Sequence, residues 1–245
     1  MIIYLGFDDT DIPNADYGTG KLARWFENEL SDGYRLWAVV RQQLLVHESI
    51  PYTSHNSASC VIIDAPNHSC LGQIIEKAVG HVERFALKGS DPGVCVACES
   101  DPSLSRLIAF GRQCTHRVVS QRDALKAASN VHLSGHGGTS DGIIGATAAV
   151  GLTAYGYCGR FIEFGGLRKF PKMVRVSDLE RANILVVSMD RDCRVPGPED
   201  IVYTKGWLRP RLWAGRAALC ATPIGDGVWE SLGERRKQNR LKQDV

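Results

Sequence analysis

The chain begins with an apolar run that ends in three carboxylates within four residues. Ile2 to Phe7 read as a buried strand, and Asp8, Asp9 and Asp11 follow it directly in the stretch MIIYLGFDDTD. Carboxylates this close repel one another, and the repulsion grows where water is excluded. The end of this strand therefore favours a bound cation, and Mg²⁺ suits carboxylates that leave positions open for water and substrate phosphates. The alternative is a solvated turn in which an aspartate caps the following structure.

Strand-like and helix-like segments alternate along the first two thirds of the chain. Periodic apolar positions predict helices at 18–30, at 71–86 and within 102–128, and a run of small residues predicts another at 142–157. Apolar runs bounded by turn residues predict strands at 34–46, 57–65 and 91–98. This interleaving predicts an α/β or α+β fold, a layered mixed sheet with packed helices.

The last third of the chain is less regular. Strand-like runs at 159–167, 182–189 and 216–223 are separated by Pro-Gly-rich turns such as VPGPED. The composition shifts near Gly165 to Pro171. We therefore expect one larger domain over residues 1–165 and a small, β-rich C-terminal piece over residues 166–245.

The composition is that of a globular protein and does not indicate what the protein binds. Of 245 residues, 44% are hydrophobic and 23% charged, which is ordinary for a globular protein. The net charge of +2 argues neither for nor against nucleic acid, because a strongly basic domain would be its electrostatic footprint. No apolar run approaches the roughly 20 residues of a membrane helix, and no basic-then-apolar leader opens the chain. We expect a cytoplasmic protein without a membrane partner.

A glycine-rich stretch precedes the helix expected at 142–157. Glycines can take positive φ, so that consecutive backbone N–H groups converge on an anion. The glycines here are Gly135, Gly137, Gly138, Gly142 and Gly145. A hydroxyl or carboxylate can cap the helix, whose N-terminus attracts negative charge, and the candidates are Thr139, Ser140 and Asp141. These features predict a phosphate cradle, and the alternative is a surface turn before a closely packed helix.

A second polar stretch, IPYTSHNSASC, precedes the strand expected at 57–65. It offers hydroxyl, imidazole and amide groups as ligands for a substrate or nucleotide: Thr53, Ser54, His55 and Asn56. A plain connecting loop is the alternative.

Two other features have simpler explanations. Cys95 and Cys98 form one CxxC that Cys114 and His116 could complete as a zinc set, but buried structural cysteines fit a strand leaving a Pro-Gly turn better. The tail ERRKQNRLKQDV could touch RNA phosphates or an acidic partner, although a solvated terminal helix explains its charges as well.

Four short motifs stand in a recognisable order. They are a strand ending in GFDDTD, the polar loop IPYTSHNSA, a DPGV turn, and a glycine loop running into GIIGATAAVG. Together they resemble the N-terminal, kinase-like part of the archaeal tRNA-Ile 2-agmatinylcytidine synthetase family, over about residues 1–165. The resemblance implies an ATP-binding domain over that span. In the family, ATP and Mg²⁺ activate a tRNA cytidine by phosphorylating its carbonyl oxygen, and agmatine then displaces the phosphate.

The resemblance also implies roles for individual residues. Asp8, Asp9 and Asp11 would serve the metal ion and phosphoryl transfer. The phosphates would be lined by Gly138, Thr139, Ser140, Gly142 and Gly145, and the family's polar loop would be matched by Thr53 and Asn56. The chain departs from the pattern at Ser54 and Asp141, where the family often has basic residues. Up to Val245 it also lacks the OB-fold and zinc ribbon with which the family grips tRNA.

The sequence thus predicts a Mg²⁺-dependent, ATP-using phosphotransferase or ligase. Its acceptor is open: a small molecule, a nucleobase, or RNA presented by a partner protein. The alternative is a nucleotide-binding module that does not catalyse and serves a partner. The missing basic residues favour the module, and three adjacent carboxylates favour the enzyme, because nucleotide binding alone does not need them.

Overall fold

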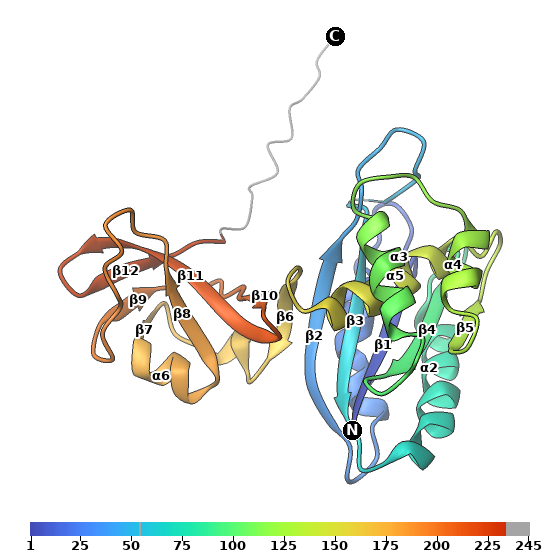
Figure 1. Cartoon of the computed structure of the whole chain (residues 1–245), viewed down its shortest axis with the longest axis horizontal. Helices are drawn as coiled ribbons and strands as arrows, with labels where there is room; N and C mark the ends of the chain where they lie inside the picture. Colours follow the sequence, from blue (N-terminus) through green and yellow to red (C-terminus); the bar gives the residue numbers. More distant parts are fainter. Residues whose placement is uncertain (54, 234–245) are drawn as a thin grey trace. The chain divides into compact units, whose positions relative to one another are not determined.

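The computed structural model describes residues 1–53 and 55–233, which form two compact units (Figure 1). Unit 1 consists of Met1–Gly165 together with Arg211–Ala217, and unit 2 contains Gly166–Pro210 and the chain from Ala218. Arg211–Ala217 belongs to unit 1 because strand β10 pairs with β6 there. The basic tail lies outside the described residues.

Unit 1 is built on an antiparallel sheet. Its strand order is β5-β4-β1-β3-β2-β6-β10. The bounds are β1 Ile2–Asp8, β2 Arg35–Gln43, β3 Ser57–Asp64, β4 Gly93–Cys98, β5 His132–Gly135, β6 Arg160–Phe164 and β10 Arg211–Trp213. Strand β1 pairs with β3 on one side and β4 on the other. A strand in the middle of a sheet that is covered on both faces buries both rows of side chains, which explains its continuous apolar run.

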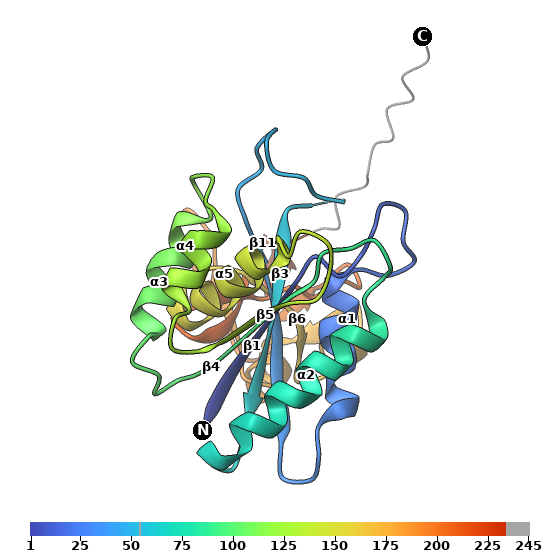
Figure 2. The same cartoon turned by 90° about the vertical axis from the view of Figure 1, so that its right-hand side faces the viewer.

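Helices cover both faces of this sheet, and Figure 2 shows them on its two sides. One face carries α1 (Thr19–Trp25), continued by a 3₁₀ turn at Phe26–Glu29, and α2 (Leu71–Phe85). The other face carries α3 (Leu104–Gln113), α4 (Gln121–Ala127) and α5 (Gly142–Tyr155). Each face has its own apolar core. The layered α/β fold predicted from the sequence is confirmed.

Helix α5 approaches the sheet unusually closely. A Cβ atom on Gly6 of β1 would lie 2.1 Å from the carbonyl oxygen of Ala146. The small residues of GIIGATAAVG therefore serve this contact between backbones, which a larger residue at Gly6 would prevent. As a result, the N-terminal end of α5 is held over the end of β1.

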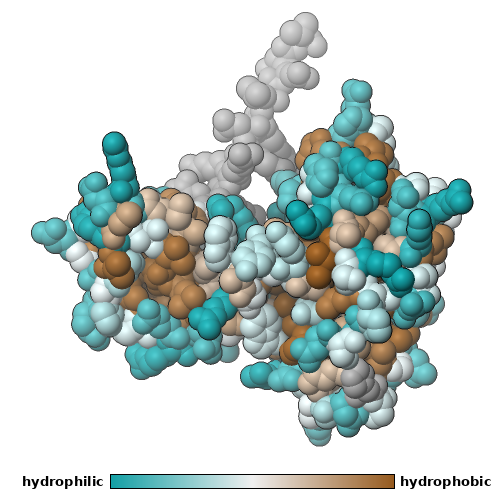
Figure 3. Space-filling view, in the orientation of Figure 1, coloured by the Kyte–Doolittle hydropathy of each residue, from teal (hydrophilic) through white to brown (hydrophobic). Residues whose placement is uncertain are grey.

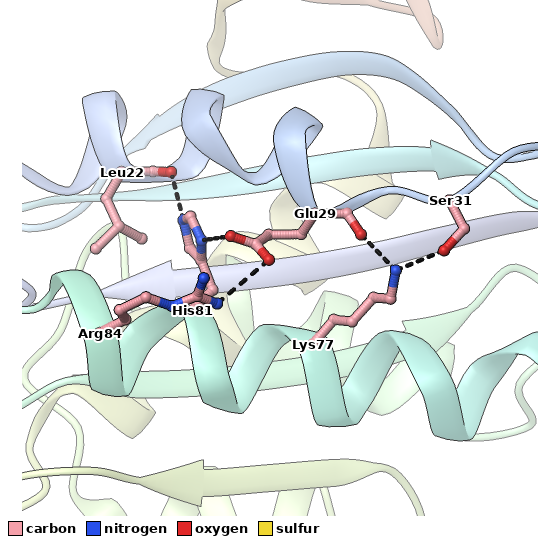
Figure 4. Close-up of polar contacts among 6 residues, drawn as sticks. All are labelled: Leu22, Glu29, Ser31, Lys77, His81 and Arg84. Atoms are coloured by element: carbon pink, nitrogen blue, oxygen red, sulfur yellow. Dashed lines mark hydrogen bonds and ion pairs between the residues drawn. The ribbon is translucent and has the colours of Figure 1, made fainter.

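The two helices on the opposite face are joined by a buried histidine (Figure 4). The side chain of His81 in α2 is fully buried, and its Nε2 lies 3.0 Å from the carbonyl oxygen of Leu22 in α1. Its Nδ1 lies 3.1 Å from Glu29 Oε1. Both ring nitrogens therefore lie within hydrogen-bond distance of an oxygen atom, one in α1 and one in the 3₁₀ turn that follows it. Nearby, Lys77 donates to the Glu29 carbonyl oxygen at 2.5 Å and to Ser31 Oγ at 2.6 Å.

Unit 2 is small and rich in short strands. It contains β7 Met173–Arg175, α6 Val176–Arg181, β8 Ile184–Ser188, β9 Ile201–Tyr203, β12 Val228–Ser231 and, from Ala218 on, β11 Arg216–Gly225. Strands β11, β12, β9 and β7 are neighbours in that order, β8 pairs with β11, and β12 and β9 run parallel. Hydrophilic residues are spread over the visible surface of both units in Figure 3.

The structure also differs from the sequence prediction in several short elements. The glycine-rich stretch before the helix expected at 142–157 contains β5, which pairs with β4, although no strand was predicted there. Three-residue strands such as β7, β9 and β10 were not predicted, because three residues carry too little periodicity to show an alternating pattern. No helix among the described residues is long and apolar enough to cross a membrane.

Candidate functional site

The acidic turn, residues 8–11 with the carboxylates of Asp8, Asp9 and Asp11, lies at one end of the unit 1 sheet. Asp8 is the last residue of β1, and Asp9 turns the chain sharply with a φ of 51°. The strand therefore does not continue through Asp9 and Asp11. The Asp8 carboxylate packs against α5, where a Cβ atom on Gly145 would lie 1.7 Å from Asp8 Oδ2. Gly145 thus leaves room for this carboxylate.

Asp11 ties the acidic turn to two other segments. Thr53 Oγ1 donates a hydrogen bond of 3.2 Å to Asp11 Oδ1. The other carboxylate oxygen lies where a Cβ atom on Gly18, just before α1, would be only 2.3 Å away. The structure therefore brings the polar loop to the acidic turn through Thr53.

The other members of the polar loop do different work or lie elsewhere. Asn56 Nδ2 donates to the carbonyl oxygen of Leu45 at 2.6 Å, which holds the chain beyond β2. His55 is exposed, and Ser54 lies outside the described residues. The hydrogen bond of Asn56 to Leu45 is the kind of contact expected of a plain connecting loop.

Asp91, at the turn before β4, is a member of the site that sequence reasoning missed. Its carboxylate accepts two hydrogen bonds from Thr139, one from the backbone N–H at 2.9 Å and one from Oγ1 at 2.8 Å. Its carbonyl oxygen accepts from the N–H of Gly142 at 3.0 Å. The only signal was the DPG turn, and its partners lie about 50 residues away in the chain.

The glycines of the loop between β5 and α5 serve close packing. Gly135, Gly137 and Gly138 do not take the positive φ expected of them, and Ser140 does, with φ 62°. A Cβ atom on Gly137 would lie 2.4 Å from the carbonyl oxygen of Ser90, and one on Gly138 would lie 2.4 Å from Asp91 Oδ1. The loop needs glycine because it lies directly against the 90–92 turn.

The N-terminus of α5 is closed by the chain itself. Asp141 occupies the N-cap position without a capping side-chain bond, and instead accepts from Gln121 Nε2 at 2.6 Å. The N–H groups of Ile143 and Ile144 bond to the carbonyl oxygens of Ser140 and Asp141. These backbone donors are thus engaged within the loop.

Five carboxylates gather in this region, and the pKa values of Asp8, Asp9 and Asp11 are raised. Burial, with the charge of Asp9 adding to it, raises the pKa of Asp8 to about 7. Burial also raises the pKa of Asp9 to about 6, helped by the charges of Asp91, Asp11 and Asp141. Burial raises the pKa of Asp11 too, against the hydrogen bond from Thr53, which lowers it. The cluster therefore favours a positive charge that would relieve this repulsion.

The described side chains do not form a complete metal cage. Among residues 1–53 and 55–233, no group of three or more His, Cys, Asp or Glu side chains is arranged to hold a metal ion. Cys95 and Cys114 are buried, and burial raises the pKa of each thiol to about 12. Thiols in that environment stay protonated and act as small apolar side chains.

A cavity of about 340 Å³ borders the glycine loop. It is lined by the end of α2, by residues 86–92 and by residues 136–138. His136 belongs to this lining, and its Nδ1 lies 3.8 Å from a carboxylate oxygen of Glu83, which also lines the cavity. Its Nε2 lies 2.8 Å from Ser134 Oγ. The lining also includes Gly138 of the glycine loop and Asp91, which binds that loop. The volume of the cavity is in the range of small-molecule sites.

Comparison with known proteins gives a fold relationship. No family model and no curated sequence matches the chain. A TiaS–tRNA(Ile2)–ATP complex matches with 21% identity and a TM-score of 0.51, covering 62% of this chain and 36% of that one. Apo TiaS, described as tRNAIle2 agmatidine synthetase, matches with 21% identity and a TM-score of 0.49, over 62% and 35%. A tRNA fluorescent labelling enzyme matches with 22% identity and a TM-score of 0.49, covering 62% of this chain and 36% of that one.

The chain spans about a third of the length of the proteins it matches. At this identity the likeness concerns the fold alone. Over 62% of its length, the chain has a TiaS-like fold.

Proposed function

We propose that this protein is an ATP-using phosphotransferase or ligase whose reaction takes place at the acidic turn. One observation carries the proposal. The carboxylates of Asp8, Asp9 and Asp11 lie at the same end of the sheet as Asp91 and the glycine loop. Their mutual repulsion calls for a cation, and ATP is bound in a complex of the protein with which this chain shares its fold.

The residues present fit a magnesium ion bound together with a nucleotide. Mg²⁺ is usually held by one or two carboxylates and completed by substrate phosphates and water, so a full protein cage is not needed. Asp9 and Asp11 would hold it, since both are partly exposed and both have a raised pKa. When bound, Mg²⁺ would neutralise phosphate charge during transfer.

The chain's own residues would supply position and a proton acceptor. Asp8, with its pKa raised to about 7, is suited to take a proton from the attacking group near neutral pH. Thr139 and the glycine loop would orient the phosphates, once Thr139 exchanges Asp91 for a phosphate oxygen. The 340 Å³ cavity beside the loop would receive the nucleoside. The acceptor is a small molecule, a nucleobase or RNA presented by a partner, and the TiaS-like fold favours a base in tRNA.

One observation favours the second candidate, a nucleotide-binding module without catalysis. Both donors of Thr139 are engaged by Asp91, which occupies the place of an anion in the loop. A module of this kind would bind ATP and release it unchanged. Turnover measurements separate the two candidates.

The test is ATP binding and hydrolysis with and without Mg²⁺, with phosphate, ADP and AMP resolved separately. Total tRNA, free nucleosides and agmatine are added in turn as acceptors. We expect Asp9→Asn to lower Mg²⁺-dependent turnover by on the order of 10²-fold, because it removes a charge that positions the phosphates. Asp16→Asn is the matched control, since Asp16 is exposed in the same loop.

The products identify the reaction. ADP with phosphate indicates cleavage of the terminal phosphoryl group, and AMP indicates cleavage between the α and β phosphates. Binding with no turnover in the presence of every acceptor favours the module. No ATP binding by the wild type contradicts both candidates.

A further inference from the structure

Three arginines stand in one row across neighbouring strands of unit 1. Arg41 of β2 lies directly opposite Arg160 of β6, and Arg160 lies directly opposite Arg211 of β10. Opposite residues of antiparallel strands point to the same face, with Cβ atoms about 5 Å apart. The three arginine side chains therefore leave the sheet side by side on one face, over a span of about 10 Å.

This row has no internal counter-charge. Arg41 is partly buried and donates through Nε to Ser57 Oγ at 2.9 Å. Burial, together with the positive charge of Arg160, lowers the pKa of Arg41, so the two cations are within electrostatic range. Arg160 and Arg211 are exposed. In the part of the chain that the structure describes, none of the three is in an ion pair with a carboxylate.

An exposed indole continues the row. Trp213 is two residues beyond Arg211 in β10, so strand alternation places both side chains on the same face. Trp213 is 56% exposed. A large exposed aromatic beside a line of cations is the combination that binds single-stranded nucleic acid, in which bases stack on the ring and phosphates meet the cations.

The row lies at the same end of the sheet as the acidic turn. Arg41 is opposite Ser59 of β3, and Ser59 is opposite Phe7 of β1, the residue before Asp8. Two strand spacings, about 10 Å, therefore separate Arg41 from the end of β1. A ligand lying along the row would run towards the carboxylates.

We propose that Arg41, Arg160, Arg211 and Trp213 form a binding surface for a short single-stranded oligonucleotide. Successive phosphates lie across the arginines, whose planar forks match phosphate oxygens, and a base stacks on Trp213. The span of the row exceeds one phosphate group, which favours a ligand with several phosphates in line. This surface is separate from the carboxylate cluster, and binding to it does not require ATP turnover.

The test is fluorescence anisotropy with a 5′-labelled single-stranded RNA 10-mer and the full chain, over a series of salt concentrations. We expect Arg160→Gln to weaken binding about fivefold or more. The fall of log affinity with log salt should also become shallower by about 0.7 in slope, the value for one phosphate contact on a single strand. We expect Trp213→Ala to weaken binding about fivefold or more with little change in slope, because stacking releases no counterion.

Arg122→Gln is the matched control, because Arg122 is exposed on α4 and carries the same charge. It should bind like the wild type. Equal weakening by Arg122→Gln and Arg160→Gln would overturn the proposal, because net charge alone would then explain binding. So would absence of binding at low salt.

Two further measurements keep the result unambiguous. Tripolyphosphate is used as a competitor. Efficient competition combined with no effect of Trp213→Ala would overturn the oligonucleotide assignment and point to a polyphosphate ligand.

ATP binding and Tm are measured on every variant, and unchanged values show that the fold and the carboxylate site are intact. Loss of RNA binding with ATP binding retained thereby separates this surface from the proposed reaction.

Discussion

The carboxylate of Asp91 receives both the backbone N–H and the hydroxyl of Thr139, a residue 48 positions further along the chain. These two bonds fasten the glycine loop to the turn before β4. They also place a negative charge where it raises the pKa of Asp9. One residue therefore influences both the shape of the loop and the charge of the acidic turn.

We expect Asp91→Asn to lower the free energy of unfolding by about 1 kcal/mol, because an amide can accept only one of the two bonds well. The pKa of Asp9 should fall as the neighbouring charge disappears. Urea unfolding and NMR titration of the Asp9 carboxyl carbon measure the two effects. A double-mutant cycle with Thr139→Val isolates the pair, and additive effects of the two substitutions would contradict the coupling.

Stability should depend on pH in the opposite sense to that of most acidic clusters. The folded-state pKa values of Asp8 and Asp9, about 7 and 6, lie above the ordinary value of 3.8, so the folded chain binds more protons than the unfolded chain between these limits. Their contribution to stability is fully present below about pH 4 and is lost as pH rises through 6 and 7.

We therefore expect this cluster to lower Tm between pH 5 and pH 8, and Asp9→Asn to flatten that fall. Thermal unfolding at half-unit pH steps gives the comparison, with Asp16→Asn as control. Mg²⁺ at pH 8 should raise the Tm of the wild type and of Asp16→Asn more than that of Asp9→Asn. A pH profile that is unchanged in Asp9→Asn would show that the cluster does not carry this dependence.

Gly145→Ala should damage the site although alanine favours helices. The new Cβ atom would lie 1.7 Å from Asp8 Oδ2, so the carboxylate would have to leave its place against α5. We expect loss of ATP turnover, because Asp8 is the proton acceptor of the proposed reaction.

Gly80→Ala is the control for helix propensity. Gly80 lies in α2 with no atom within 4 Å of its added Cβ. This variant should gain roughly 0.5–1 kcal/mol of stability. Equal behaviour of the two alanine variants in unfolding and turnover would contradict the role assigned to Gly145.

The buried contact between His81 and Glu29 should matter for stability and for its pH dependence. Burial acts to raise the pKa of Glu29, but the contacts with His81 and Arg84 outweigh it and hold the pKa below its ordinary value of 4.5. A lowered folded-state pKa contributes stability above the unfolded value, and that contribution is lost as pH falls through the folded value.

We expect Glu29→Gln to be less stable than the wild type near pH 7, with the difference shrinking below pH 4.5. His81→Ala should lose about 2–4 kcal/mol, since it leaves a buried cavity and removes two polar contacts. Urea unfolding at pH 7 and pH 4 is the measurement. Glu76→Gln, at an exposed position of α2, is the control for charge.

Local patterns predicted the long elements well. The helices expected at 71–86 and 142–157 correspond to α2 and α5, and the run before the acidic triplet is β1, ending at Asp8. In α2 the apolar residues recur with helical periodicity, β1 is an unbroken apolar run, and α5 is a run of small and apolar residues that is buried almost throughout. Such a pattern indicates how the element is buried, and it depends only on residues within that one segment.

Long-range pairing decided the rest. No local pattern predicts the hydrogen bond between Thr139 and Asp91. Nor does one predict that strand pairing places Arg41, Arg160 and Arg211 in one row. The role of the glycines also came from close approach to the 90–92 turn, where left-handed backbone had been expected. The physical reason is that residue types and spacing set what each segment can bury, whereas strand order and register determine which distant side chains become neighbours.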